Sequence, residues 1–255
     1  MARLEVERIP VGDNYVWLLH EPAAGATGVV DPATAAPVLD RLQTHGWSLD
    51  WILTTHHHAD HTGGNLELKR ATGCRIAGPK KDAARVPGLD LGLVEGDTFS
   101  LGNTIARVLE TPGHTSGHIS FWFEAAKALF CADTLFSLGC GRLFEGTPAQ
   151  MWHSLQKLAA LPDDTVVYCG HEYTLSNARF ALTVDPANPA LKARAEEVER
   201  LRAGGQPTVP STLGAEREAN PFLRPGDPAI RQTLGMEGAS DVDVFAEIRR
   251  RKDRF

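Results

Sequence analysis

Residues 54–64 read Thr-Thr-His-His-His-Ala-Asp-His-Thr-Gly-Gly and directly follow the apolar run Trp51-Ile52-Leu53. Four side chains of types that bind metal ions fall within six positions of this segment: His56, His58, Asp60 and His61. His56 and His58 are two residues apart, so they project the same way from an extended or looping backbone. Asp60 and His61 are adjacent and must diverge toward a different centre. The spacing therefore favours two metal ions over one, and over a surface loop that binds nothing.

Three further candidate ligands follow apolar strands in the same manner. They are His114 in the loop after Arg107–Leu109, Asp133 after Leu129–Cys131, and His171 after Val166–Tyr168. Strand ends gathered at one edge of a sheet sandwich would hold these side chains together on loops fixed by a rigid scaffold. The mixture of imidazoles and carboxylates suits zinc first, with iron or manganese also acceptable.

Composition excludes several other classes of protein. The 255 residues are 42% hydrophobic, enough for a sizeable core, and no run of about eighteen apolar residues predicts a membrane span. The formal net charge of −6 argues against a nucleic-acid surface. The first eight residues offer no apolar stretch for a signal peptide, so we expect a cytoplasmic location, and the four cysteines lack C-x-x-C spacing and read as reduced, buried thiols.

The order of predicted elements indicates two domains. Strands are predicted over 4–9, 15–20, 28–30, 52–55, 75–77, 104–109, 119–123, 128–131 and 165–169, with helices over 33–44, from 66 to 73 and from Thr147-Pro148 onward. After Tyr173 only amphipathic helices appear, over 176–184, 189–203 and 242–251, joined by turn-rich connectors at 204–210 and 221–228. We therefore expect a layered α/β domain, which carries the candidate metal ligands, over 1–172 and a helical domain over 173–255.

The H-x-H-x-D-H run resembles the signature of the metallo-β-lactamase superfamily, and further segments are similar to glyoxalase II, the hydroxyacylglutathione hydrolase family. These segments are Thr111-Pro-Gly-His-Thr, Gly139-Cys-Gly-Arg-Leu-Phe-Glu-Gly, Gly170-His-Glu-Tyr-Thr, Asn220-Pro-Phe-Leu-Arg and Arg249-Arg-Arg-Lys-Asp. The similarity runs from Asp13 to Phe255. It implies an αββα sandwich followed by a smaller helical domain that helps to bind glutathione thioesters.

The resemblance also implies how the ligands divide between two ions per chain. His56, His58 and His114 would bind one ion, Asp60, His61 and His171 the other, and Asp133 would bridge both. Two cations sharing a water lower its pKa from about 15.7 toward 7, so hydroxide is the expected nucleophile, with Asp60 and Asp133 as the catalytic carboxylates. No G-x-S-x-G segment or histidine-paired cysteine predicts covalent catalysis.

The implied reaction is hydrolysis of S-(2-hydroxyacyl)glutathione, typically S-D-lactoylglutathione, to glutathione and D-lactate, the second step of methylglyoxal detoxification. Thiolate leaves readily without a general acid, which suits this chemistry. Carried over by position, the substrate contacts are Arg142, Tyr173, Arg249 and Lys252. The family often has lysine at position 142 and tyrosine at position 144; Arg142 keeps the charge, whereas Phe144 lacks a hydroxyl. A monomer is the default expectation.

Four alternative functions remain open on the sequence alone. A mononuclear-iron persulfide dioxygenase of the same superfamily would not need Asp60, His61 and His171 as a second ligand set. A nuclease is disfavoured by the acidic charge balance, and a purely structural zinc site would be closed by four protein ligands. A β-lactamase proper would lack the helical domain. The basic C-terminus could also be a solvated helix end, where cations meet the helix dipole.

Overall fold

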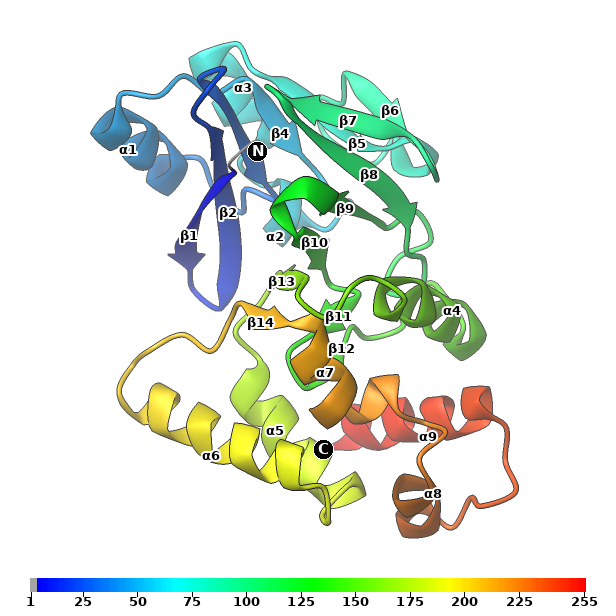
Figure 1. The fold of residues 1–255 in the computed structure, drawn as a ribbon. Helices are drawn as coiled ribbons and strands as arrows, with labels where there is room; N and C mark the ends of the chain where they lie inside the picture. Colours follow the sequence, from blue (N-terminus) through cyan, green and yellow to red (C-terminus); the bar gives the residue numbers. More distant parts are fainter. Residues whose placement is uncertain (1–3) are drawn as a thin grey trace. The chain divides into compact units, whose positions relative to one another are not determined.

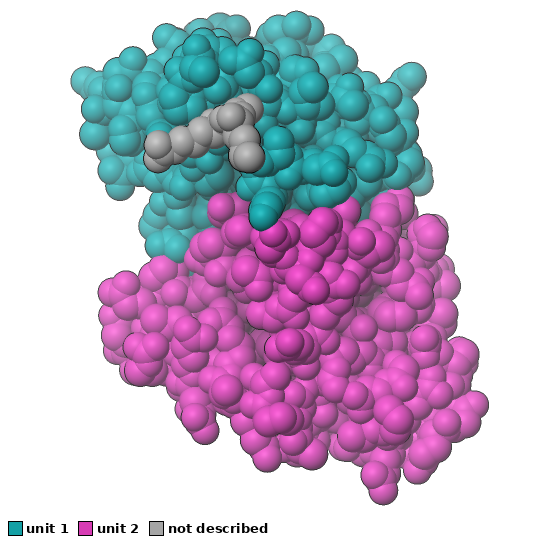
Figure 2. All heavy atoms as spheres, viewed as in Figure 1, with its two compact units in different colours: residues 1–111, 116–132 teal, residues 112–115, 133–255 magenta. Residues whose placement is uncertain are grey.

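The computed structural model describes residues 4–255, which form two compact units (Figure 2). Within the described chain, unit 1 comprises residues 4–111 and 116–132, and unit 2 comprises residues 112–115 and 133–255. Figure 1 shows their helices and strands. Among residues 4–255, no helix is long and apolar enough to span a membrane.

Unit 1 contains two β-sheets. The first has the strand order β1 (Glu5–Val11), β2 (Asn14–Glu21), β3 (Ala26–Val30), β4 (Trp51–Leu53), β5 (Arg75–Pro79) and β6 (Leu91–Leu93). Strand β2 pairs antiparallel with both β1 and β3, and the strands from β3 to β6 pair parallel with one another. The second sheet contributes the antiparallel strands β7 (Thr98–Leu101), β8 (Thr104–Glu110), β9 (Ile119–Phe123) and β10 (Ala128–Ala132).

The two sheets of unit 1 pack face to face. Trp51 meets Phe99 edge-on, with ring centroids 5.1 Å apart. The other face of the first sheet is covered by α1 (Ala36–His45) and α3 (Asn65–Thr72), whose Val38, Leu42 and Leu68 are fully or almost fully buried in one apolar cluster with strand residues. Burial of these apolar faces produces helix–sheet–sheet layering.

Tight backbone packing places residues 56–61 shortly after β4. His58 is extended and precedes the short helix α2 (Ala59–Thr62). A Cβ on Gly63 would lie 2.4 Å from the Ala33 carbonyl oxygen, so only glycine allows this approach. Gly73 then ends α3 in the left-handed conformation, as the sequence predicts.

Unit 2 is mainly helical. Its elements are β11 (Leu135–Phe136), β12 (Gly139–Cys140), α4 (Pro148–Ala159), β13 (Val166–Cys169), α5 (Thr174–Val184), α6 (Pro189–Ala203), β14 (Ser211–Thr212), α7 (Leu213–Ala219), the 3-10 helix η3 (Pro221–Leu223), α8 (Pro228–Leu234) and α9 (Asp241–Arg254). Thr147 and Gln150 form the capping box that begins α4. Helices α5, α6 and α7 share a core that includes Ala178, Leu191 and Ala219.

The structure confirms the longer predicted elements and corrects several short ones. Every strand and helix predicted from periodicity occurs, with small shifts at the ends. The expectation of no strand after Tyr173 is wrong, because Ser211–Thr212 pairs with β13. The 3-10 helix η3 lies within the second predicted connector, α8 begins at its last residue, and α7 lies between the two connectors, where no helix is predicted. These elements have two to seven residues, too few for a periodic pattern to register.

Candidate metal centre

A buried carboxylate organises the ligands of unit 1. Asp31 is 3% exposed and has a left-handed φ of 49°. Its carboxylate accepts hydrogen bonds from the Thr55 amide at 2.8 Å and the Thr55 hydroxyl at 2.7 Å, and lies 3.2 Å from His61 Nδ1. The Thr55 oxygen is in turn 3.0 Å from His56 Nδ1. With both Nδ1 atoms donating, Nε2 of each histidine keeps its lone pair for a cation.

Asp60 is held from outside the motif by Asn14. The Asn14 amide donates to both the carboxylate and the backbone carbonyl of Asp60, at 3.1 Å in each case. The same carboxylate oxygen, Oδ2, lies 3.5 Å from His61 Nε2. The adjacent side chains Asp60 and His61 therefore present ligand atoms close to each other.

In unit 2, the two oxygens of Asp133 each face a different histidine. His114 Nε2 lies 3.3 Å from Oδ2, and His171 Nε2 lies 3.4 Å from Oδ1. His114 Nδ1 donates to the Arg142 carbonyl oxygen at 2.9 Å, which leaves Nε2 as the ligand atom. Each oxygen of this carboxylate therefore lies beside one candidate metal-ligand imidazole.

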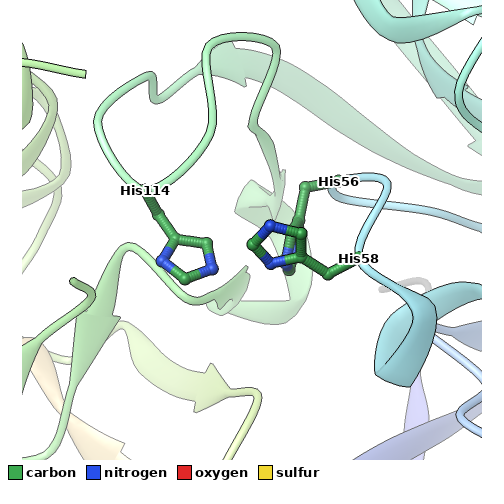
Figure 3. Close-up of side chains that lie close together, drawn as sticks. All are labelled: His56, His58 and His114. Atoms are coloured by element: carbon green, nitrogen blue, oxygen red, sulfur yellow. The ribbon is translucent and has the colours of Figure 1, made fainter. Parts of the chain in front are cut away.

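Three groups of side chains have ligand atoms within 4.8 Å of one another: His56 with His58 and His114, Asp60 with His61 and His171, and Asp31 with His56 and His61. Figure 3 shows the first group, with its three imidazole rings close together. The first two groups have the same histidines and Asp60 that the resemblance assigns to two ions, and their role as ligands stays a prediction. In the third group, the Asp31 carboxylate accepts two hydrogen bonds from Thr55. The donor chemistry fits a divalent metal ion.

Replacing Asp31 with asparagine is expected to weaken metal binding by about 10- to 100-fold, the usual effect of losing a partner of a ligand. In asparagine one carboxylate oxygen becomes an NH₂ group, so a hydrogen-bond donor would face the donor groups of Thr55 or His61. Competition with a chromogenic chelator would measure the change. Asp40→Asn, at an exposed position of α1, is the matched control. Unchanged affinity in the Asp31 variant would contradict the orienting role.

Two histidines near the motif, His57 and His118, contact other side chains. His57 Nδ1 lies 3.0 Å from the buried Asp82 carboxylate, and Arg85 contacts its Nε2. His118 Nδ1 lies 2.9 Å from the Thr111 hydroxyl. Sequence reasoning missed Asp82, because nothing in its local spacing marks it as a partner of the motif.

The four expected substrate residues lie in unit 2 and differ in exposure. Arg142 is exposed, whereas Arg249 is 4% exposed and donates from Nη1 to the Cys140 carbonyl at 2.8 Å. Lys252 Nζ donates to the Ser176 hydroxyl at 2.8 Å. The Tyr173 ring stacks on the His171 imidazole with centroids 4.6 Å apart. Tyr173 and Arg142 thus each contact a metal-ligand candidate directly.

Phe144 is 62% exposed, and its ring meets the His114 imidazole edge-on with centroids 5.2 Å apart. Its amide also donates to the His114 carbonyl at 3.3 Å. The exposed ring therefore lies beside a metal-ligand candidate and presents an apolar face where the resemblance suggests a tyrosine.

Family models and relatives cover the whole chain. The model described as metallo-beta-lactamase superfamily matches residues 9–171, and that described as hydroxyacylglutathione hydrolase C-terminus matches residues 172–255. A relative from Methylococcus capsulatus, named hydroxyacylglutathione hydrolase, is 60% identical over 99% of both chains. Another of the same name from Rhodospirillum rubrum is 56% identical over 100% of both.

Solved structures share the fold at low sequence identity. ETHE1 from Myxococcus xanthus has a TM-score of 0.70 and 23% identity, covering 96% of this chain and 90% of that one. A metallo-beta-lactamase from Staphylococcus aureus has a TM-score of 0.67 and 20% identity, covering 98% of this chain and 71% of that one. Together with the family models, these likenesses establish a metallo-beta-lactamase domain followed by a helical C-terminal domain.

Proposed function

Because the chain belongs to the hydroxyacylglutathione hydrolase family of the metallo-beta-lactamase superfamily, we propose that it hydrolyses S-(2-hydroxyacyl)glutathione to glutathione and a 2-hydroxy acid. S-D-lactoylglutathione is the typical substrate, and D-lactate formation would be the second step of methylglyoxal detoxification. The observation that carries the proposal is the Asp133 carboxylate with a histidine at each oxygen, 3.3 and 3.4 Å away. Such an arrangement suits a hydrolase that uses two ions.

We propose two divalent ions per chain, with zinc preferred and iron or manganese as substitutes. The proposed ligands are His56, His58 and His114 for one ion, Asp60, His61 and His171 for the other, and Asp133 for both. Bound ions of this kind lower the pKa of a water toward 7 and polarise a carbonyl group. Asn14 fixes the Asp60 carboxylate, and Asp31 fixes two imidazoles, so the ligand atoms are oriented before substrate arrives.

Glutathione recognition is assigned to the cationic side chains of unit 2. In the proposal, Arg142, Arg249 and Lys252 attract the carboxylates of the tripeptide, and Tyr173 contacts its backbone. Hydrolysis of a thioester needs no proton donor to the leaving sulfur, because a thiolate is stable near neutral pH. All four cysteines are buried, and burial raises the pKa of Cys140 to about 11 and that of Cys169 to about 12. Neither is therefore an effective nucleophile.

The Michaelis constant for glutathione thioesters is expected to rise as pH increases through about 8. Burial, followed by repulsion from Arg249 and Arg142, lowers the pKa of Lys252 from 10.5 to about 8, and Asp253 opposes the shift. Lys252 is cationic below that pH and attracts a carboxylate; above it the charge is lost. Initial-rate kinetics from pH 6 to 9 would measure KM. In Lys252→Arg, which stays charged, the rise should disappear; an identical profile in that variant would contradict this assignment.

The function is tested by measuring S-D-lactoylglutathione hydrolysis together with elemental analysis of the same sample. We expect rapid release of glutathione and about two metal ions per chain. A simple thioester that lacks the tripeptide is the control and should react far more slowly. A fully loaded sample that is inert toward glutathione thioesters would overturn the proposal. One iron per chain with oxygen consumption on glutathione persulfide would instead identify a dioxygenase.

The remaining expectations form part of the same proposal. We assign residues 1–172 to the metal domain and residues 173–255 to the substrate domain. We propose that the protein acts on a small-molecule substrate, has no nucleic-acid or membrane partner, and is a cytoplasmic monomer. Buried thiols agree with a reducing compartment. Cell fractionation and light scattering would test location and oligomeric state.

A further inference from the structure

One carboxylate lies among the three cations assigned to glutathione. Asp253 is in the last turn of α9, and its side chain is 44% exposed. Its Oδ1 atom lies 3.1 Å from Arg249 Nε and 2.9 Å from Arg249 Nη2. Arg142 Nε is 4.0 Å from the same oxygen. A single oxygen atom thus faces guanidinium groups from two separate segments of unit 2.

The contacts of Asp253 leave Arg249 in one orientation. Asp253 occupies the edge formed by Nε and Nη2, and Nη1 donates to the Cys140 carbonyl at 2.8 Å. The guanidinium also lies 5.2 Å from the Phe222 ring centre. Because both contacts direct N–H groups, together they fix the plane of the guanidinium and the directions in which its remaining N–H groups point.

From this geometry we propose that Asp253 is a positioning residue for glutathione binding: it fixes the orientation of Arg249 and offsets the mutual repulsion of Arg142, Arg249 and Lys252. The inference rests on the proposed function, because it specifies how that substrate site is organised. Asp253 acts through its neighbours and need not contact the substrate.

The environment of Lys252 supports this role. Its ammonium group faces Arg249 and Asp253 on α9 and Arg142 on the loop between β12 and α4, and it lies 5.5 Å and 5.1 Å from the ring centres of Phe180 and Phe255. Burial and the two arginines lower its pKa, and Asp253 is the charged group that raises it. Without this carboxylate, Lys252 would lose its proton at lower pH.

A simple helix-stabilising pair is the competing explanation, since Arg249 and Asp253 are spaced i,i+4 and exposed pairs of this kind contribute little. Glu247 offers a matched control. It pairs with Arg250 and Arg251 on the same helix, at i,i+3 and i,i+4 spacing. If Asp253 acts only as a helix-stabilising pair, Glu247→Gln and Asp253→Asn should have similar effects.

The test is isothermal titration of metal-loaded protein with free glutathione from pH 6 to 9, with kcat and metal content measured alongside. In Asp253→Asn we expect the dissociation constant at pH 8 to rise about tenfold, a usual loss for a charge-assisted contact, and its increase with pH to begin at lower pH than in wild type. Metal content and kcat should stay unchanged. Glu247→Gln should match wild type, and Asp253→Glu should recover part of the affinity.

Three outcomes separate the possible failures. If Asp253→Asn binds glutathione as tightly as wild type with the same pH profile, the positioning role is wrong and the proposed function stands. If Glu247→Gln weakens binding equally, the effect belongs to the helix and the inference is overturned. If the wild-type protein does not bind glutathione, both the proposed function and this inference are wrong.

Discussion

Asp133→Asn is expected to lower kcat/KM for S-D-lactoylglutathione by about three orders of magnitude and to reduce bound metal from about two ions to one, because two-ion catalysis contributes several kcal/mol. Asparagine keeps the shape of the side chain but replaces one carboxylate oxygen with an amide nitrogen. In the present structure the two oxygens face His114 Nε2 at 3.3 Å and His171 Nε2 at 3.4 Å. An amide nitrogen cannot act as a metal ligand at the second of these positions.

The same reasoning applies to the ligands assigned to one ion only. Asp60→Ala or His171→Ala should leave about one ion per chain and depress kcat strongly. His153→Ala is the control for the histidine variant, because His153 is exposed on α4 and outside both ligand sets. Elemental analysis and steady-state kinetics on matched samples measure both effects. Full metal content and near-normal kcat in Asp133→Asn would rule out the bridging role.

A Gly141→Ala change is expected to lower kcat/KM by about 100-fold, since displacing catalytic groups by about 1 Å costs that much. A Cβ at this position would lie 1.9 Å from the Asp133 carbonyl oxygen and 3.3 Å from His114 Nδ1. Neither neighbour can retreat easily: one is the backbone of a ligand, and the other donates to Arg142. The added methyl group must therefore shift the loop that carries Arg142, or the ligand itself.

The control for this substitution is Gly238→Ala, where an added Cβ meets no heavy atom within 4 Å. It should preserve both activity and metal content, which isolates the steric effect at position 141 from any general cost of losing a glycine. Kinetics and chelator competition should reveal a joint loss of turnover and metal affinity in Gly141→Ala. Wild-type behaviour would mean that the loop relaxes without moving the ligand, contrary to our expectation.

The sequence predicts the fold well wherever elements are long. Pro189–Ala203 and Ile119–Phe123 have the predicted boundaries. The first has apolar residues at helical spacing along its length, and the second is a run of mostly apolar residues that is typical of a buried strand. The hairpin of β11 and β12 has two residues in each strand and produced no pattern. This hairpin nevertheless supplies the Cys140 carbonyl that holds Arg249.

Local spacing was enough to pick out the candidate ligands, whereas it gave no sign of the contacts that hold these side chains in place. The H-x-H-x-D-H run places its donors within a few residues, so covalent connectivity alone brings them together. Asp82 supports His57 from 25 positions away, and the Arg142 carbonyl supports His114 from 28 positions away. A backbone carbonyl has no sequence signature at all, so only the folded chain reveals it.

Residue 142 has two separate roles: its backbone oxygen accepts a hydrogen bond from His114, and its side chain is assigned to substrate binding. The metal-ligand candidate is held by a main-chain oxygen, 2.9 Å from Nδ1, that every amino acid supplies. The side chain of residue 142, by contrast, is exposed and available to interact with substrate. Substrate preference can therefore diverge at position 142 through side-chain replacement while the ligand keeps its anchor, which makes this loop a suitable place for evolution, or a protein engineer, to change specificity without rebuilding the catalytic core.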